Sequence, residues 1–227
     1  MAASPALARE ELIEPEVRHE THFRAQPFLR EVRKRGDTLF WEGGQSTHLI
    51  HVMEGFVKLV KHGASGKDII VGIYGPGDIL GEMNLLDRQP YNATAVVMTP
   101  AVISRESLDR LHSQLHKNPV LLRSIAQTLS TRLRETQDTV QQIATERVER
   151  RIAAMLLKLA KCRRNEEGCS LRVPLKRQEM AELVGTTVET TIRVLSRFTQ
   201  DGALRRIGRQ LFIMDMDYLR AIAQSAG

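Results

Sequence analysis

Cysteine and aromatic residues are scarce in this sequence, and each shortage excludes a class of protein. Only 2 of the 227 residues are cysteines. Cys162 and Cys169 cannot supply a disulfide framework or a four-thiolate zinc site within one chain. We therefore expect two free thiols, with a redox switch between them as the alternative. Aromatic residues make up 4% of the chain, which argues against a surface that stacks on single-stranded bases.

Long hydrophobic runs are missing as well. No apolar stretch is long enough to cross a bilayer, and residues 1–30 mix glutamate, arginine and histidine where a secretory signal would be apolar. We therefore expect a cytoplasmic protein with no membrane partner.

Positive charge is in excess, and the chain is long enough for two domains. A net charge of +6 and a pI near 9.6 suit a polyanionic partner, although a basic balance alone fits many other proteins. A length of 227 residues allows two modest hydrophobic cores.

The stretch from Lys176 to Phe198 predicts two short helices joined by a tight turn. Apolar residues recur at helical spacing in the first helix, at Met180, Leu183 and Val184. Gly185 then supplies the backbone freedom that a turn needs, and Thr186 or Thr187 can cap the second helix. One stripe of that helix comprises Thr191, Val194, Leu195 and Phe198. This pattern indicates a helix-turn-helix.

The opposite side of the second helix carries Val188, Glu189, Ile192 and Arg193, which we call the reading face. Side chains at this spacing near a helix N-terminus reach base edges when the helix enters the major groove. The Arg193 guanidinium can donate two hydrogen bonds to a guanine, to O6 and N7, and Glu189 can accept a hydrogen bond from cytosine. Simpler interpretations also exist: Glu189 in a capping box with Thr186, Arg193 on a solvated face, and Ile192 in the core.

Three short motifs stand in this stretch: Arg177-Gln178-Glu179, Val184-Gly185, and Val188-Glu189-Thr190 followed by Arg193. They resemble the Crp/Fnr family of bacterial transcription regulators, and Val188 places the resemblance nearer the FNR branch than the catabolite activator, which has an arginine there. The FNR branch usually has a serine at the position of Ile192. We therefore expect a half-site that resembles TTGA, and the resemblance does not determine the identity of its outer bases. The resemblance implies double-stranded DNA, RNA polymerase and a second copy of the chain as partners.

The predicted DNA contacts come from the helix pair and from a β-hairpin wing around Gly208. They are Arg177, Thr187, Val188, Glu189, Thr190, Ile192, Arg193, Arg205 and Arg209. An exposed hairpin can also carry arginines without touching DNA.

Short apolar runs separated by glycines, between residues 28 and 105, predict a small antiparallel barrel. The expected strands cover residues 49–53, 56–60, 69–73 and 93–97, and a short helix is expected around Glu106 to Leu115. This order, followed by Gly81-Glu82, resembles the cyclic-nucleotide-binding β-roll of the same family.

The resemblance also indicates an effector site, at Gly81, Glu82, Asn92, Ala93 and Thr136. Relatives that bind cyclic nucleotides have a phosphate-binding arginine where this chain has Asn92, and a serine where it has Ala93. An amide does not replace the charge-assisted contact of a guanidinium, so cyclic AMP is disfavoured, and Arg88 could substitute only after the loop rearranges. The N-terminal arm has no cysteine, which disfavours an iron-sulfur cluster. The sequence leaves haem and other small molecules as candidates for the effector.

Three histidines, His48, His51 and His62, raise the alternative of a β-barrel metal enzyme. Such sites place two histidines at i and i+2 on one strand face, whereas His48 and His51 are three residues apart. We therefore expect no enzyme and no metal site.

A long helix is expected after Asn118-Pro119, with an apolar stripe in steps of three and four that is typical of a coiled coil. Its predicted dimer contacts are Leu122, Ala126, Leu129, Leu133, Val140 and Ile143. The stripe is too long to be buried by a small barrel, so we expect a parallel homodimer. An amphipathic helix packed within one subunit is the alternative.

The predicted fold is α+β, with an irregular arm at 1–27, a β-roll sensor at 28–116, a dimerisation helix at 117–145 and a winged helix-turn-helix at 146–227. The predicted function is a dimeric, sequence-specific DNA-binding regulator whose β-roll senses an effector. The alternative is a ligand- or haem-binding signalling module that acts mainly through protein contacts.

Overall fold

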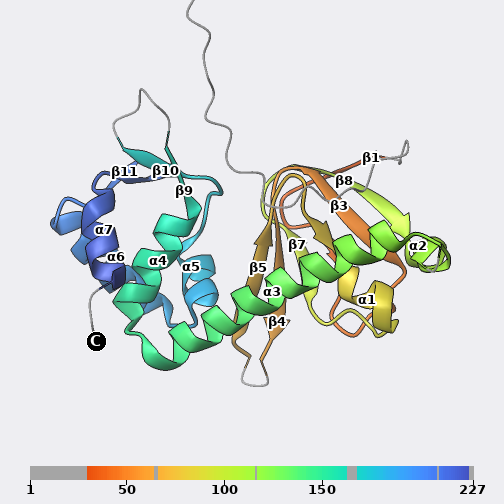
Figure 1. Cartoon of the computed structure of the whole chain (residues 1–227). Helices are drawn as coiled ribbons and strands as arrows, with labels where there is room; N and C mark the ends of the chain where they lie inside the picture. Colours follow the sequence, from red (N-terminus) through yellow and green to blue (C-terminus); the bar gives the residue numbers. More distant parts are fainter. Residues whose placement is uncertain (1–29, 64–65, 116, 163–167, 209, 225–227) are drawn as a thin grey trace, which may run out of the picture.

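The computed structural model describes residues 30–63, 66–115, 117–162, 168–208 and 210–224. The predicted arm at 1–27 and Arg209 of the wing lie outside these ranges. Two domains lie side by side, and one long helix connects them (Figure 1). Within the described ranges, no helix is long and apolar enough to span a membrane.

The N-terminal domain is a β-roll of two antiparallel sheets. The first sheet has the order β1, β8, β3, β6, with bounds Arg30–Arg33, Ala101–Ser107, His48–Glu54 and Ile79–Leu80. The second has the order β2, β7, β4, β5, with bounds Thr38–Phe40, Thr94–Val97, Val57–His62 and Asp68–Tyr74. A core that includes Ile50, Val57 and Val97 fills the roll. The four expected strands correspond to β3, β4, β5 and β7.

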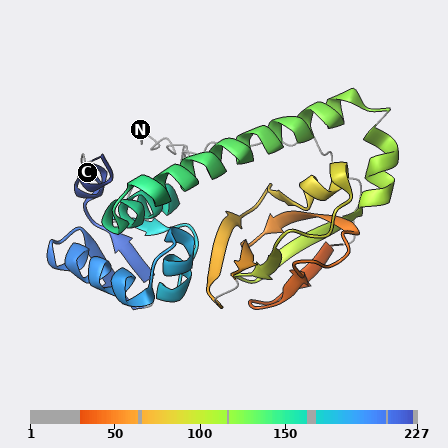
Figure 2. The same cartoon turned by 90° about the horizontal axis from the view of Figure 1, so that it is seen from below.

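Three helices cover one side of the roll: α1 (Glu82–Asp87), α2 (Leu108–Leu115) and α3 (Pro119–Thr145). The short helix expected around Glu106 to Leu115 is confirmed as α2, but it starts two residues later, because Glu106 pairs with Leu49 in the sheet. The start of α3 is as predicted: the Asn118 side chain caps it by accepting from the Leu121 amide at 3.1 Å. Figure 2 shows α3 running from α2 to the C-terminal domain.

The C-terminal domain contains α4 (Val148–Leu159), α5 (Arg177–Val184), α6 (Val188–Gln200) and α7 (Met216–Gln224). Its sheet has the order β11, β12, β10, β9, with bounds Leu204–Ile207, Gln210–Ile213, Cys169–Leu171 and Ala160–Cys162. Phe198, Leu156 and Val173 lie at the centre of its core. Met98 of the β-roll is buried in this same core, so the two domains share apolar contacts.

The two cysteines form a disulfide between β9 and β10. The expectation of two free thiols is therefore wrong. Cys162 and Cys169 are directly opposite each other in the antiparallel pair, and this register brings their sulfur atoms together. The redox-switch alternative had already paired these two cysteines, which are seven positions apart in the sequence, and the strand register supplies the geometry for the bond.

The apolar stripe of α3 divides into a covered part and an uncovered part. Leu121 and Ile125 pack into the core beneath α1 and α2, and Leu129 packs partly against it. Most of the predicted dimer contacts lie on the other side and are exposed: Leu122, Ala126, Leu133, Val140 and Ile143. The assignment of Leu129 to the seam is thus only half consistent with the structure, since part of its surface belongs to its own subunit.

Candidate nucleic-acid interface and effector site

The turn between α5 and α6 is built on Gly185. This residue ends α5 with φ +68°, in the left-handed region that glycine enters without steric cost. Thr187 then caps α6, because its hydroxyl oxygen accepts from the Thr190 amide at 3.2 Å. The predicted helix-turn-helix is confirmed in its elements and in its turn residue.

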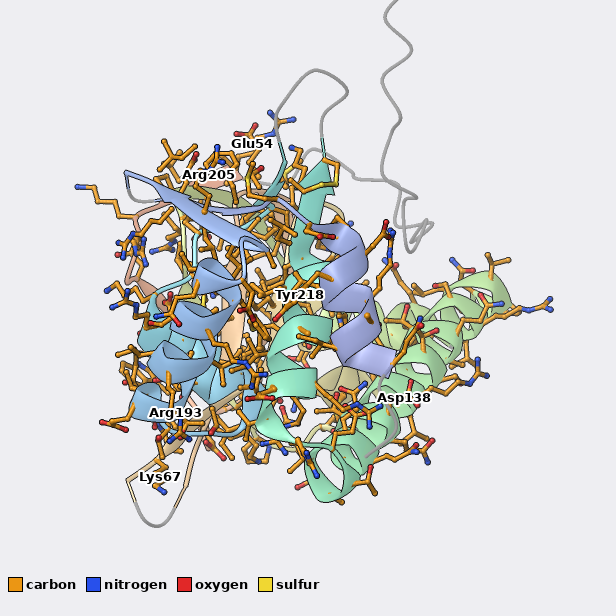
Figure 3. The ribbon with its side chains drawn as sticks, turned by 90° about the vertical axis from the view of Figure 1, so that its left-hand side faces the viewer. Glu54, Lys67, Asp138, Arg193, Arg205 and Tyr218 are labelled. Carbon is orange, nitrogen blue, oxygen red and sulfur yellow. A yellow bond between two sulfur atoms is a disulfide. The ribbon has the colours of Figure 1, made fainter. Side chains whose placement is uncertain are left out.

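The two sides of α6 differ in burial as the sequence indicates. All four residues of the expected stripe are buried: Thr191, Val194, Leu195 and Phe198. On the reading face Glu189 and Arg193 are exposed, while Val188 and Ile192 are half-buried. Figure 3 shows this domain from its outer side, with Arg193 on α6 and Arg205 on β11 both toward the left edge. The charged members of the reading face are thus available to a ligand.

Glu189 is not a capping residue. The α6 cap is Thr187, so the capping position three residues later belongs to Thr190, and the alternative capping box with Thr186 is wrong. The Glu189 carboxylate instead accepts hydrogen bonds from its own amide and from the Thr187 side chain, which lower its pKa. It therefore remains an ionised acceptor at neutral pH.

A carboxylate does cap the first helix. Glu179 is buried at the start of α5 and accepts from the Lys176 amide at 2.8 Å. Arg177, which belongs to the predicted DNA contacts, is exposed at the first position of that helix.

The predicted wing is present as an antiparallel hairpin of β11 and β12. Arg205 lies opposite Phe212, and Arg206 lies opposite Leu211. Both arginines are exposed. Arg206 donates to the Gly208 carbonyl at 3.2 Å, and Arg209 is outside the described residues.

In the β-roll, the predicted effector residues are only partly brought together. Gly81 and Glu82 begin α1, and Glu82 is 2% exposed. Asn92 is exposed, and its amide contacts Met83 Sδ at 3.6 Å. The Thr136 hydroxyl donates to the Arg132 carbonyl of its own helix at 2.8 Å. Arg88 lies at the end of α1, where its guanidinium is 3.5 Å from Asp109 Oδ1.

Arg132, which the sequence did not single out, completes the Glu82 site. Its guanidinium forms an ion pair with Glu82 Oε1 and donates to the Ile79 carbonyl at 2.5 Å. The same group lies 4.7 Å from the centre of the Tyr74 ring. Glu82 Oε2 is buried with no hydrogen-bond partner among the described residues. The only sequence hint was position, since Arg132 precedes Thr136 by one helical turn.

A separate cavity of about 430 Å³ lies between α1, α2 and the loop that precedes β3. Arg88, Asp109 and His112 are among its lining residues, together with the apolar side chains of Leu85 and Leu108. None of the five predicted effector residues lines it.

The part of the chain that the structure describes contains no candidate metal site. No group of three or more histidine, cysteine, aspartate or glutamate side chains there could hold a metal ion.

Comparison with known proteins decides the family. Residues 30–118 match the cyclic nucleotide-binding domain, and residues 150–222 match the Crp-like helix-turn-helix domain. The chain is 31% identical, over 187 residues, to the CRP-like cAMP-activated global transcriptional regulator of Mycobacterium tuberculosis, covering 82% of this chain and 84% of that one. The chain belongs to the Crp/Fnr family.

Further relatives match as well. The nitrogen fixation regulation protein FixK of Bradyrhizobium diazoefficiens is 30% identical over 191 residues, covering 83% of this chain and 79% of its own length. Among solved structures, the c-di-GMP responsive regulator CLP of Xanthomonas campestris has a TM-score of 0.73 and 26% identity, and the match covers 82% of this chain and 93% of that one. This Crp/Fnr protein is therefore a DNA-binding transcription regulator with a sensor domain of the cyclic-nucleotide-binding type.

Proposed function

We propose that this Crp/Fnr protein acts as a homodimer that binds a palindromic DNA site through the reading face of α6. The observation that carries the proposal is the exposure of Glu189 and Arg193 on a helix whose opposite side is fully packed. A helix anchored in this way can enter the major groove without losing its own core. Arg177 on α5 and Arg205 on the wing supply phosphate contacts on either side.

The second chain covers the exposed stripe of α3. Leu133 and Val140 are each 60% exposed, which is unusual for large apolar side chains at regular helical spacing. A parallel partner helix would remove this surface from water, and its two-fold axis would match the symmetry of a palindrome. RNA polymerase is the further partner that membership of the family implies.

The effector is not recognised through a cyclic phosphate in the usual manner. Several relatives are described as cAMP-activated or as cyclic AMP receptors, but this chain has Asn92 and Ala93 at the positions that bind the phosphate in nucleotide-binding members. The cation that faces Glu82 is Arg132 from α3. An effector that reaches this site would act on α3 directly, and so on the dimer.

Selection from a pool of random duplexes tests the proposed function. We expect enrichment of an inverted repeat with TTGA-like half-sites, whose centres lie about one helical turn or ~34 Å apart. Failure to enrich any repeated half-site would contradict dimeric, sequence-specific binding.

A further inference from the structure

The C-terminal domain contacts the β-roll through a cluster of charged side chains that we call the interdomain latch, which comprises Arg35, Lys58, Glu179 and Glu182. Lys58 Nζ lies 3.3 Å from Glu179 Oε1 and 3.7 Å from Glu182 Oε2. Arg35 Nη2 lies 3.7 Å from Glu179 Oε2. Lys58 and Arg35 belong to the β-roll, whereas both carboxylates belong to α5.

The latch is largely withdrawn from water. The side chain of Lys58 is 16% exposed, that of Glu179 is 8% exposed and that of Glu182 is 11% exposed. Only Arg35, with 42% exposure, lies at the rim. Removing one partner of such a buried pair leaves an uncompensated charge, so loss of the Lys58 ammonium perturbs both carboxylates of α5.

Apolar contacts surround the latch and hold the same two elements together. Lys58 on β4 is directly opposite Ile73 on β5, and Ile73 and Phe56 pack against the core of the C-terminal domain. Figure 1 shows α5 beside β5. Met98 enters that core from the turn between β7 and β8.

Glu179 links the latch to the helix that faces DNA. Its Oε2 atom accepts from the Lys176 amide and so caps α5, while its Oε1 atom faces Lys58. Arg177 and Gln178, on the first turn of the same helix, are exposed. A shift of Lys58 would therefore move the carboxylate that sets the start of α5. The reading face remains exposed while the latch is closed, so the latch does not occlude DNA binding.

We propose that Lys58 is a positioning residue for DNA recognition: it fixes the orientation of α5 and α6 relative to the β-roll, and thereby the distance between the two reading faces of the dimer. This rests on the proposed dimeric DNA binding. A dimer with fixed helices accepts one spacing of half-sites, whereas a dimer with loosened domains accepts several.

The test compares Lys58→Met with a matched control, Lys61→Met. Lys61 lies on the same strand, but it pairs with Glu42 within the β-roll at 3.3 Å and is 48% exposed. Lys58→Arg, which keeps the positive charge, serves as the rescue variant. Circular dichroism and the melting temperature establish that each variant is folded.

Binding is measured on three duplexes: the preferred operator, and the same operator with one base pair inserted or removed between the half-sites. Each change rotates one half-site by roughly 35° about the DNA axis. Wild-type protein, Lys61→Met and Lys58→Arg should lose about tenfold or more in affinity on the altered duplexes, and Lys58→Met should lose clearly less. If Lys58→Met loses the same factor as the wild type, the proposal is overturned.

Amide hydrogen exchange tests the latch without DNA. In Lys58→Met, amides at the start of α5, including that of Lys176, should exchange faster than in the wild type, and in Lys61→Met they should not. Unchanged exchange in Lys58→Met would overturn the proposal by itself. If the wild type prefers no duplex, the proposed dimeric DNA reading fails, and the exchange result still decides whether Lys58 orders α5.

Discussion

The Arg132 guanidinium of α3 forms an ion pair with the buried Glu82 carboxylate at the start of α1. This contact joins the helix that carries the exposed apolar stripe to Gly81 and Glu82, two residues of the predicted effector site. We therefore expect a ligand that competes with Arg132 for Glu82 to shift α3.

Removal of the Arg132 charge should destabilise the β-roll strongly. Arg132→Met leaves Glu82 buried and without its cation, so we expect the free energy of unfolding to fall by about 3 kcal/mol or more. The double variant Glu82→Gln/Arg132→Met should recover part of this loss because no buried charge remains. Urea denaturation measures both values, and a loss below about 1 kcal/mol in the single variant would show that the ion pair is not buried in solution.

Cyclic AMP should neither raise the melting temperature nor strengthen DNA binding, because the chain lacks the arginine that binds the cyclic phosphate. Asn92→Arg, at an exposed position, restores that cation and should produce a measurable thermal shift with cyclic AMP. Differential scanning fluorimetry reports both results. A shift in the wild type that Glu82→Ala weakens would contradict this account of the sensor.

The exposed stripe of α3 should hold the dimer together. Leu133→Glu combined with Val140→Glu places like charges in the seam at a cost of several kcal/mol, and should yield monomers in analytical ultracentrifugation. Gln141→Glu, exposed on the same helix but outside the stripe, is the matched control and should leave the dimer intact. Retention of the dimer in the double variant would refute the seam.

The disulfide between Cys162 and Cys169 should be detectable by thiol titration. Unfolded protein that has not been treated with reductant should show no free thiol, and Cys162→Ser/Cys169→Ser should be less stable by roughly 2 kcal/mol. Two titratable thiols in protein purified without reductant would show that the bond does not form under those conditions.

The sequence predicted the features whose signals are local. Helical periodicity and Gly185 located the helix-turn-helix, Asn118-Pro119 marked the start of α3, and alternation around Gly208 indicated the wing. Each of these depends on residues that are neighbours in the chain, so composition and spacing suffice.

Contacts between distant segments were not predictable in the same way. Met98 lies in the core of the other domain, Lys58 faces Glu179 across 121 residues, and the pairing of β8 with β3 decides that Glu106 is strand. No local pattern distinguishes these residues from others of their kind. Strand β1 was not predicted either. Its sequence is mostly charged and shows no alternation of apolar and polar residues, so it becomes a strand only through its pairing with β8.

The competition titration of Arg193→Ala tests the central claim most directly. At fixed salt, binding to the selected operator and to random DNA is compared for wild type, Arg193→Ala, Arg193→Lys and Arg205→Ala. If Arg193 forms two hydrogen bonds with a guanine, Arg193→Ala should weaken the binding free energy by ~1 to 3 kcal/mol per half-site on the operator and by little on random DNA. Arg193→Lys should be nearly as damaging to specificity, because an ammonium cannot donate the two parallel hydrogen bonds of a guanidinium. Arg205→Ala should weaken both DNAs alike and make the salt dependence shallower. Equal losses on operator and random DNA for Arg193→Ala would contradict the assignment of the reading face.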